Sequence, residues 1–358
     1  MIQKIRVGII GTGFGANVHA PMFQHHPGFD LQAIASVSRG RTDEVREKTG
    51  IARVYEDWRE MLAQEELDLV AVTSAPYLHH EMVLAAYERG LHVLCEKPMA
   101  LDAEQTQAMI AARDAAGKQG FVNFEFRFRP ARRKAKEIIE SGQLGRLVHV
   151  RYETSFPSYL ALTSKPRGWL GNEELGGGML GALGSHMFDS LRWWTQEEVT
   201  RLQGLLPIHV PSYTDHTGNT ELRTADDAFL AIGHLTGGTT FRVEFVSAIR
   251  HAQSGAKLEV FGTQGTLVMT DDRNVELSMG DDPFHEVELG LYTEAPKTMS
   301  APADRYYTAF YPMIDAVHGA LTTGERHPIL PTFEDGHRAQ LLLDAVRKSA
   351  KDGQRIFF

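Results

Sequence analysis

A glycine-rich stretch near the start of the chain has the spacing of a phosphate-binding loop. Residues 11–16 read Gly-Thr-Gly-Phe-Gly-Ala, which matches the pattern G-x-G-x-x-[G/A]. In such a loop the first glycine makes a tight turn, the second lets the backbone approach a pyrophosphate, and the third small residue lets the helix pack on the strand. Because the motif lies between a predicted strand and a predicted helix, we predict a dinucleotide site. The alternative is a glycine turn without a ligand.

The end of the second predicted strand bears on which dinucleotide would bind. An Asp or Glu about 20 residues after the loop usually bonds the ribose 2′-hydroxyl of NAD. Here residues 35–41 read Ala-Ser-Val-Ser-Arg-Gly-Arg and contain no acid. Ser38, Arg39 and Arg41 suit a 2′-phosphate, because guanidinium groups pair with phosphate and no carboxylate repels it. The sequence therefore favours NADP over NAD, against the nearly equal alternative that both arginines are solvated loop residues.

Two further stretches place titratable groups where a substrate could react. Glu96-Lys97-Pro98 ends a predicted strand, and ligands of open parallel sheets bind beyond the carboxyl ends of the strands. A surface Glu–Lys pair is the alternative. Residues 176–186 read GGGMLGALGSH, so a flexible segment leads into His186. A catalytic histidine is usually held by a carboxylate one helical turn away, but that position is Ala182, and His186 could instead fill a helix core.

The elements that must position these residues fall into two regions. Short apolar runs alternate with amphipathic ones over the first 120 residues, which predicts a parallel sheet with helices on both faces. The expected strands are 5–10, 31–37, 67–73, 92–95 and 120–123, and the expected helices are 15–25, 42–49, 58–64, 78–89 and 103–116. We therefore predict an α/β fold with a Rossmann dinucleotide-binding domain over residues 1–122.

In the rest of the chain the predicted helices and strands no longer alternate regularly. Helices are expected at 132–140, 179–194, 304–322 and 332–351, and strands at 147–154 and through most of 202–289. This order predicts a substrate-binding and oligomerisation α+β domain over residues 123–358, built on a mainly antiparallel open sheet. Its final helix is expected to pack back on the N-terminal domain.

Composition narrows the classes of partner and compartment. The chain has 358 residues and a formal net charge of −9, with 46 acids against 37 bases, which argues against nucleic acid and anionic membranes as partners. The single cysteine, Cys95, excludes an internal disulfide and suits a reducing compartment. With no signal-peptide pattern and no apolar stretch near the roughly 18–20 residues of a membrane span, we expect a cytoplasmic protein. No metal-ligand spacing occurs, so no metal site is expected.

Five motifs taken together resemble one known family. They are GTGFGANVH at 11–19, TSAPYLH at 73–79, CEKP at 95–98, NFEFRFRP at 123–130, and GGGxLxxxGxHxxD at 176–189. In this order they resemble the glucose–fructose oxidoreductase/inositol dehydrogenase (Gfo/Idh/MocA) family over essentially the whole chain. The resemblance implies an oxidoreductase that acts on sugars, cyclitols or polyols with NAD or NADP. It also implies a homo-oligomer, a dimer or tetramer, in which the open sheet often forms an interface.

The resemblance implies roles for individual residues. Lys97 matches the lysine that touches both nicotinamide and the reacting hydroxyl, and His186 matches the histidine that commonly serves as acid and base. The family usually has Asp-x-Gly-x-His here, where this chain has Ala182-Leu-Gly-Ser-His186. With the residues suited to a 2′-phosphate included, cofactor contacts are expected from Gly11, Thr12, Gly13, Phe14, Gly15, Ser38, Arg39, Ser74, His79, Glu96, Lys97 and Asn123.

Three residues are candidates for contact with substrate. Trp169 lies in an irregular stretch and could stack on a sugar, although it could also simply pack. Asp189 lies three residues after His186, within reach of that ring on a helix. Tyr307 opens a helix where the family often places substrate contacts.

Ala182 leaves three hypotheses open. The enzyme could work with Lys97 and His186 alone, or the missing acid could reflect a different substrate. The chain could also be a non-catalytic regulator that senses NADP or a sugar. Within the family, a redox-assisted glycosidase or eliminase that retains its cofactor is a further alternative.

Overall fold

A computed structural model describes residues 4–36, 40–252 and 255–358. The chain divides into two compact units, Met1–Phe128 with Tyr292–His337, and Arg129–Leu291 with Arg338–Phe358. The first unit therefore extends beyond the predicted boundary at residue 122. It also includes a segment from late in the chain, Tyr292–His337, which the sequence assigned to the second domain. The reason is packing: the short turn η2 (Glu125–Phe128) contacts helix α9 (Ala303–Thr323) within this unit.

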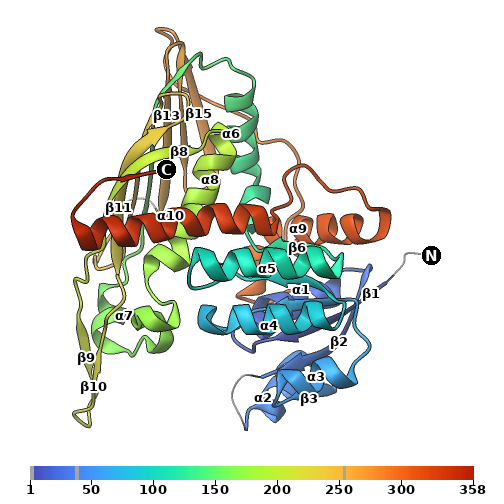
Figure 1. Ribbon diagram of the computed structural model, residues 1–358. Helices are drawn as coiled ribbons and strands as arrows, with labels where there is room; N and C mark the ends of the chain where they lie inside the picture. The colour runs from blue at the N-terminus through green and yellow to red at the C-terminus, as the bar shows by residue number, and fades with distance from the viewer. Residues whose placement is uncertain (1–3, 37–39, 253–254) are drawn as a thin grey trace. The chain divides into compact units, whose positions relative to one another are not determined.

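The first unit is a Rossmann sheet. Its six strands are all parallel and lie in the order β3-β2-β1-β4-β5-β6, so the predicted fold class is confirmed. The strands are β1 (Ile5–Ile10), β2 (Phe29–Ala35), β3 (Arg53–Tyr55), β4 (Leu69–Val72), β5 (His92–Cys95) and β6 (Gly120–Val122). The helices are α1 (Ala20–His25), α2 (Thr42–Thr49), α3 (Trp58–Gln64), α4 (Pro76–Glu88), α5 (Ala103–Ala116) and α9 (Figure 1).

The second unit is built on a mixed nine-stranded sheet in the order β16-β15-β14-β13-β7-β12-β11-β8-β17. All neighbours are antiparallel except β12 and β7. The strands are β7 (Leu147–Ser155), β8 (Val199–Leu205), β11 (Ala228–Leu235), β12 (Thr240–Val246), β13 (Ala256–Gly262), β14 (Gly265–Thr270), β15 (Asn274–Met279), β16 (His285–Glu286) and β17 (Ile356–Phe357). A separate hairpin joins β9 (Ser212–Thr214) to β10 (Thr220–Leu222).

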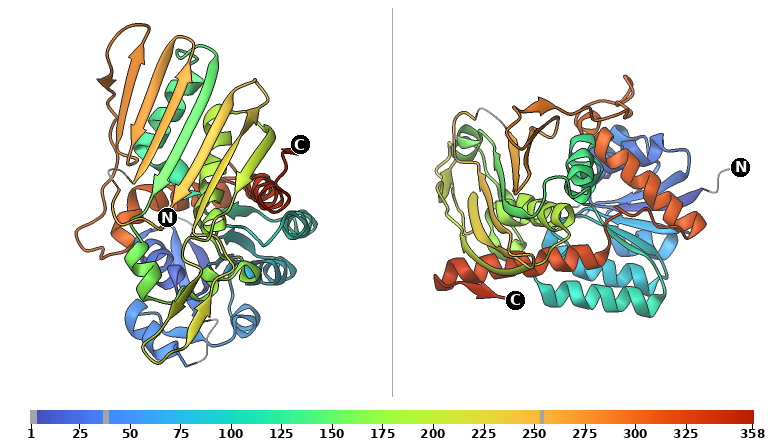
Figure 2. Two further views of the ribbon diagram at one scale, coloured as in Figure 1. Left: turned by 90° about the vertical axis from the view of Figure 1, so that its left-hand side faces the viewer. Right: turned by 90° about the horizontal axis from the view of Figure 1, so that it is seen from above.

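Among the described residues, the core of the second unit lies on one face of this sheet. Along β12, Phe241, Val243 and Phe245 are buried while Arg242 and Glu244 point to the other face. Such alternation is typical of a sheet covered on one side. Helices α6 (Pro130–Glu140) and α8 (Ser185–Thr195) lie on one side of the sheet (Figure 2), and their apolar side chains belong to the same core as the buried residues of the strands. The remaining helices are α7 (Tyr159–Ser164) and α10 (Phe333–Asp352), and α10 begins in the first unit and ends in the second.

Three features considered in the sequence can be followed in the structure: membrane-spanning helices, the cysteine, and clusters of metal-ligand side chains. None of the helices within the described ranges is long and apolar enough to cross a membrane. Cys95 is a buried free thiol, and burial raises its pKa well above the usual value. Across the same ranges, no three His, Cys, Asp or Glu side chains gather closely enough to hold a metal ion.

Candidate active site

The loop after β1 has the backbone that a phosphate-binding turn requires. Gly11 has a φ of +116°, and a Cβ atom there would lie 2.6 Å from Thr73 Oγ1 and 2.7 Å from the Thr73 carbonyl carbon. Only glycine fits this position. At the exposed Gly13, a Cβ would meet no heavy atom of the described residues within 4 Å, so there is room beside the backbone. The half-buried Thr12 lies between them, and the loop fits a dinucleotide pyrophosphate.

The helix after the loop begins with a π turn instead of the regular helix predicted over 15–25. In this turn, η1 (Gly15–His19), the N–H of Ala20 donates to the carbonyl of Gly15, five residues back. The turn ends on His19, whose ring is fully buried. That ring lies 5.5 Å from the Phe14 ring and 4.5 Å from the Phe310 ring, measured between centroids. Because π turns occur frequently at functional sites, His19 is a candidate that the motif analysis missed.

His19 belongs to a buried polar cluster with Glu96 and Asn123. Glu96 Oε1 accepts hydrogen bonds from His19 Nε2 at 2.8 Å and from Asn123 Nδ2 at 2.5 Å. Burial alone would raise the pKa of Glu96, but the hydrogen bonds from His19 and Asn123 and the neighbouring Lys97 together outweigh it and lower that pKa. Among the described residues, buried Asn123 Oδ1 has no hydrogen-bond partner. An unsatisfied buried acceptor calls for an explanation, and a bound cofactor would supply one.

Lys97 follows this cluster directly and is half-buried. The peptide bond between Lys97 and Pro98 is cis. His79 on α4 holds the segment in place, with Nδ1 at 3.1 Å from the Pro98 carbonyl and Nε2 at 3.0 Å from the Ser74 carbonyl. One ring contacts both stretches predicted to line the cofactor, so His79, Ser74 and Lys97 form a connected region with Glu96.

Of the three residues predicted to favour NADP, only Arg41 lies within the described residues. Ser38 and Arg39 lie outside the described residues. Arg41 is exposed and forms an ion pair with Glu44, with 2.9 Å between Nη2 and Oε1. Exposed pairs of this kind are weak, so Arg41 can exchange Glu44 for another anion at little energetic cost.

In the second unit, Asp226 fixes the start of the segment that carries His186. Its Oδ2 accepts the Leu180 N–H at 2.8 Å, and its backbone carbonyl accepts the Met179 N–H at 3.2 Å. Gly178 has a φ of +100°, and a Cβ there would lie 2.2 Å from Asp226 Oδ1. The carboxylate therefore sits tightly against the glycine-rich turn. Burial raises the pKa of Asp226 to about 6, although the Leu180 N–H partly opposes the shift.

His186 also follows a π turn. The turn η5 (Leu180–Gly184) leads into α8, and the Ser185 N–H donates to the Leu180 carbonyl five residues back. The interval between Ala182 and His186 therefore crosses a π turn, not the regular helix predicted over 179–194. The His186 ring is 2% exposed.

The three substrate candidates lie in different environments. Trp169 is 40% exposed on the short turn η3 (Gly168–Gly171) of the second unit, so its ring is available for stacking. Asp189 is buried on α8, one turn after His186. Tyr307 belongs to the core of the first unit, where its ring stacks on Tyr311 with 4.7 Å between centroids. Each assignment remains a prediction, and buried Tyr307 has the least surface to offer a substrate.

Comparison with known proteins tests the resemblance. Residues 5–124 match the family model described as "Oxidoreductase family, NAD-binding Rossmann fold", and residues 132–268 match the "GFO/IDH/MocA C-terminal domain". The chain belongs to the Gfo/Idh/MocA oxidoreductase family. The predicted family is thus confirmed, as is the prediction of an enzyme of the dehydrogenase and reductase class.

Relatives of this Gfo/Idh/MocA chain match it over nearly its full length. An uncharacterized oxidoreductase of Synechocystis is 30% identical, covering 98% of this chain and 95% of the relative. The myo-inositol 2-dehydrogenase of Thermotoga maritima is 26% identical and covers 98% of both. A solved structure of levoglucosan dehydrogenase in complex with NADH and L-sorbose shares the fold, with a TM-score of 0.85, 23% identity and 99% coverage of each chain.

The Asp226 carboxyl should make the stability of this Gfo/Idh/MocA chain depend on pH. Its pKa of about 6 in the folded protein exceeds the usual 3.8, so the folded state prefers the proton. The resulting stabilisation is complete below about pH 4 and is lost as the pH rises to about 6, by on the order of 3 kcal/mol. Asp226→Asn keeps an acceptor for the Leu180 N–H but does not titrate. We therefore expect it to remove this loss in urea unfolding between pH 4 and 7.

The matched control for this experiment is Asp281→Asn, which changes an exposed acid of the same unit. It should keep the pH profile of the wild-type unfolding free energy. A profile for Asp226→Asn that parallels the wild type would show that Asp226 is not the titrating group.

Proposed function

We propose that this oxidoreductase transfers a hydride between a nicotinamide cofactor and the CH–OH group of a sugar, cyclitol or polyol-like substrate. The observation that carries the proposal is the position of Lys97. It follows β5 directly, next to the His19–Glu96–Asn123 cluster, beyond the carboxyl ends of the parallel strands where cofactors of this fold bind. The names of the relatives, a cyclitol dehydrogenase and a sugar-derivative dehydrogenase, support the substrate class.

The residues of the chain would handle the proton. A bound nicotinamide supplies the hydride acceptor or donor. The Lys97 ammonium can donate a hydrogen bond to the reacting oxygen and stabilise negative charge on it. The His186 imidazole is of a type that can take or return the hydroxyl proton. The buried Glu96 carboxylate would position the Lys97 segment through its bonds to His19 and Asn123.

For the cofactor we propose NADP over NAD. Support comes from the absence of any acid in the sequence from Ala35 to Arg41, together with the weakly engaged Arg41. We expect NADPH to bind at least about tenfold more tightly than NADH in a fluorescence titration, a difference of about 1.4 kcal/mol. Arg41→Ala should reduce that ratio. Tighter binding of NADH would refute the preference.

A substrate screen tests the activity itself. Purified protein with each cofactor is offered a panel of sugars, cyclitols and polyols, and the absorbance of the reduced nicotinamide is followed. Turnover supports the dehydrogenase. Cofactor that survives dialysis, with bond cleavage and no net change in absorbance, would instead indicate the redox-assisted glycosidase or eliminase. A cofactor-dependent rise in melting temperature with no turnover of any kind would indicate a sensor.

Ala182 offers a direct test of how the site differs from its family. We expect Ala182→Asp to change activity strongly, because it places a carboxylate in the π turn that precedes His186. A gain in turnover on a simple sugar alcohol would mean that a family carboxylate was lost here. Loss of activity on the best panel substrate would mean that the alanine is part of the specificity. Unchanged kinetics for every substrate would show that position 182 is remote from the reaction.

We also propose a homo-oligomer in a cytoplasmic, reducing compartment, with a dimer or tetramer as the assembly. The support is the family resemblance for the assembly and the lone buried thiol of Cys95 for the compartment. Light scattering of the purified protein measures the assembly, and a mass of about one chain at micromolar concentration would refute it.

A further inference from the structure

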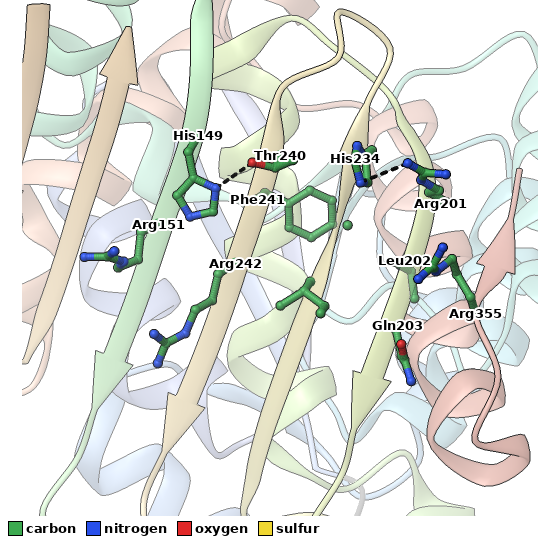
Figure 3. A pocket seen from close by; sticks show the side chains of 12 residues that line it. His149, Arg151, Arg201, Leu202, Gln203, His234, Thr240, Phe241, Arg242 and Arg355 are labelled. Atoms are coloured by element: carbon green, nitrogen blue, oxygen red, sulfur yellow. Dashed lines mark hydrogen bonds between the residues drawn. The ribbon is translucent and has the colours of Figure 1, made fainter.

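Charged side chains gather both on the surface and in the interior of this protein. A pocket of about 330 Å³ opens on the outer face of the second unit's sheet, and its lining includes Arg201, Arg242 and Arg355 (Figure 3). In the proposed homo-oligomer this open face is the expected interface between copies, so the exposure of these arginines in one chain does not mark a ligand site. The buried charge of Glu96 differs, because its hydrogen-bond partners all belong to its own unit.

Three hydrogen-bond donors converge on the Glu96 carboxylate. Its Oε1 accepts from His19 Nε2 at 2.8 Å and from Asn123 Nδ2 at 2.5 Å. Its Oε2 accepts from the backbone N–H of Lys97 at 3.3 Å. Burial opposes ionisation of this carboxyl, which is 7% exposed, yet the donors and the charge of Lys97 outweigh burial and hold the pKa of Glu96 below its usual value. Glu96 therefore carries a full negative charge at pH 7 with little contact with water.

The groups around Glu96 offset this charge only in part. His19 Nδ1 is buried and has no hydrogen-bond partner among the residues that the structure describes, so the ring fits as the neutral tautomer with its proton on Nε2. Burial lowers the pKa of His79, which leaves that ring largely neutral at pH 7. Lys97 is cationic but half-buried, so water screens its ammonium more than it screens the buried carboxylate.

The sheet topology puts this charge in one half of the dinucleotide fold. A doubly wound sheet consists of two halves that each bind a mononucleotide. The phosphate loop follows β1, in the half that β2 and β3 complete, whereas Glu96 and Asn123 follow β5 and β6 of the other half. Buried Asn123 Oδ1 accepts no hydrogen bond within the described ranges and belongs to the amide that donates to Glu96. A nicotinamide nucleotide bound in this half would meet both an acceptor and a buried anion.

We propose that the Glu96 carboxylate sets the preference of this site for the oxidised over the reduced form of the cofactor. The nicotinamide ring is cationic when oxidised and neutral when reduced, so a buried anion beside it stabilises the oxidised form selectively. This stabilisation lowers the reduction potential of the bound cofactor and makes its reduced form a stronger hydride donor. The inference rests on the proposed binding of a nicotinamide cofactor, but it does not depend on which substrate reacts.

Calorimetric titration of the protein with NADP⁺ and, separately, with NADPH tests this preference without any substrate. If NAD is the preferred cofactor, NAD⁺ and NADH take their place. Glu96→Gln keeps the size of the side chain and an acceptor oxygen but removes the charge. We expect the ratio of the Kd for the oxidised form to the Kd for the reduced form to rise at least about tenfold in this variant. That change corresponds to a rise of about 30 mV in the two-electron reduction potential of the bound cofactor.

Glu96→Asp is the matched variant, because it keeps the charge on a shorter side chain. Damage to the cluster should weaken the binding of both forms in the same proportion, so the ratio should stay within about threefold of the wild type. Glu60→Gln removes an exposed acid on α3 of the same unit and should leave both dissociation constants unchanged.

The ratio of the two dissociation constants separates a role of charge from a role of structure. A wild-type ratio in Glu96→Gln overturns the inference alone, and so does a ratio in Glu96→Asp that changes as much as in Glu96→Gln. A wild-type protein that binds neither form overturns the proposed cofactor, and this inference with it.

Discussion

Replacing Lys97 with methionine is expected to lower turnover by between about 10²- and 10⁴-fold while cofactor affinity changes little. Methionine keeps the length and much of the apolar stem of lysine but cannot donate a proton or carry charge. The loss should therefore fall on kcat, because the interaction with the reacting oxygen strengthens as negative charge develops there. Steady-state kinetics on the best substrate of the panel and a cofactor titration measure the two quantities.

Lys118→Met is the matched control, since it removes a lysine of the same unit just before β6. It should leave kcat within about twofold of the wild type, as expected for a side chain remote from the reaction. Wild-type turnover in Lys97→Met would end the proposed role of this lysine, whereas an equal loss in both variants would indicate a general effect of lost charge.

Gly178→Ala is expected to cost on the order of 3 kcal/mol of unfolding free energy and most of the activity. A φ of +100° strains an alanine by roughly 1–2 kcal/mol, and its Cβ would overlap Asp226 Oδ1, which lies 2.2 Å away. Relief requires moving either the turn or the carboxylate that accepts the Leu180 N–H. Either movement shifts the start of the segment that carries His186, and a misplacement of about 1 Å can lower a rate by about 10²-fold.

Gly218→Ala is the control that separates the cost of a positive φ from the cost of the overlap between the new Cβ and Asp226. Gly218 has a φ of +90° in the hairpin between β9 and β10, and a Cβ there meets no heavy atom of the described residues within 4 Å. This control should cost about 1 kcal/mol in urea unfolding and leave activity intact. Similar losses in the two variants would mean that Asp226 yields easily to the added methyl group.

Much of the first unit was predictable because its signals are local. Each buried parallel strand is a short apolar run, and each is followed by an amphipathic helix, so the Rossmann sheet follows from hydrophobic periodicity. The short strand β3 (Arg53–Tyr55) was missed because it is only half-buried and polar at its start. The parallel pairing of β12 with β7 was also beyond the sequence, because these strands are 85 or more residues apart and periodicity says nothing about partners.

The candidate site also divides into local features, which the sequence predicts, and contacts between distant residues, which it does not. The phosphate loop and the Glu96-Lys97-Pro98 stretch could be predicted as site candidates because their residues are adjacent in sequence. His19 was not predicted, because a histidine on a helix usually packs, and its partner Glu96 lies 77 positions away. Asp226 was missed for a similar reason, since the Leu180 N–H that it accepts is 46 positions earlier. A signal did exist in each case: His19 ends the GANVH run after the loop, and Asp226 is an acid just before an apolar strand.

The two π turns make the chain sensitive, at two specific points, to the insertion or deletion of a single residue. Each turn holds one residue more than an α-helical turn would, at 15–19 before α1 and at 180–184 before α8. Deleting a residue from either turn would give the more common helix, yet it would rotate everything on one side by about 100° relative to the other. A change in residue count would turn His19 away from Glu96, or reorient His186. Inserting or deleting one residue, which rotates the rest of the helix, should therefore disturb these two helices more than replacing one side chain.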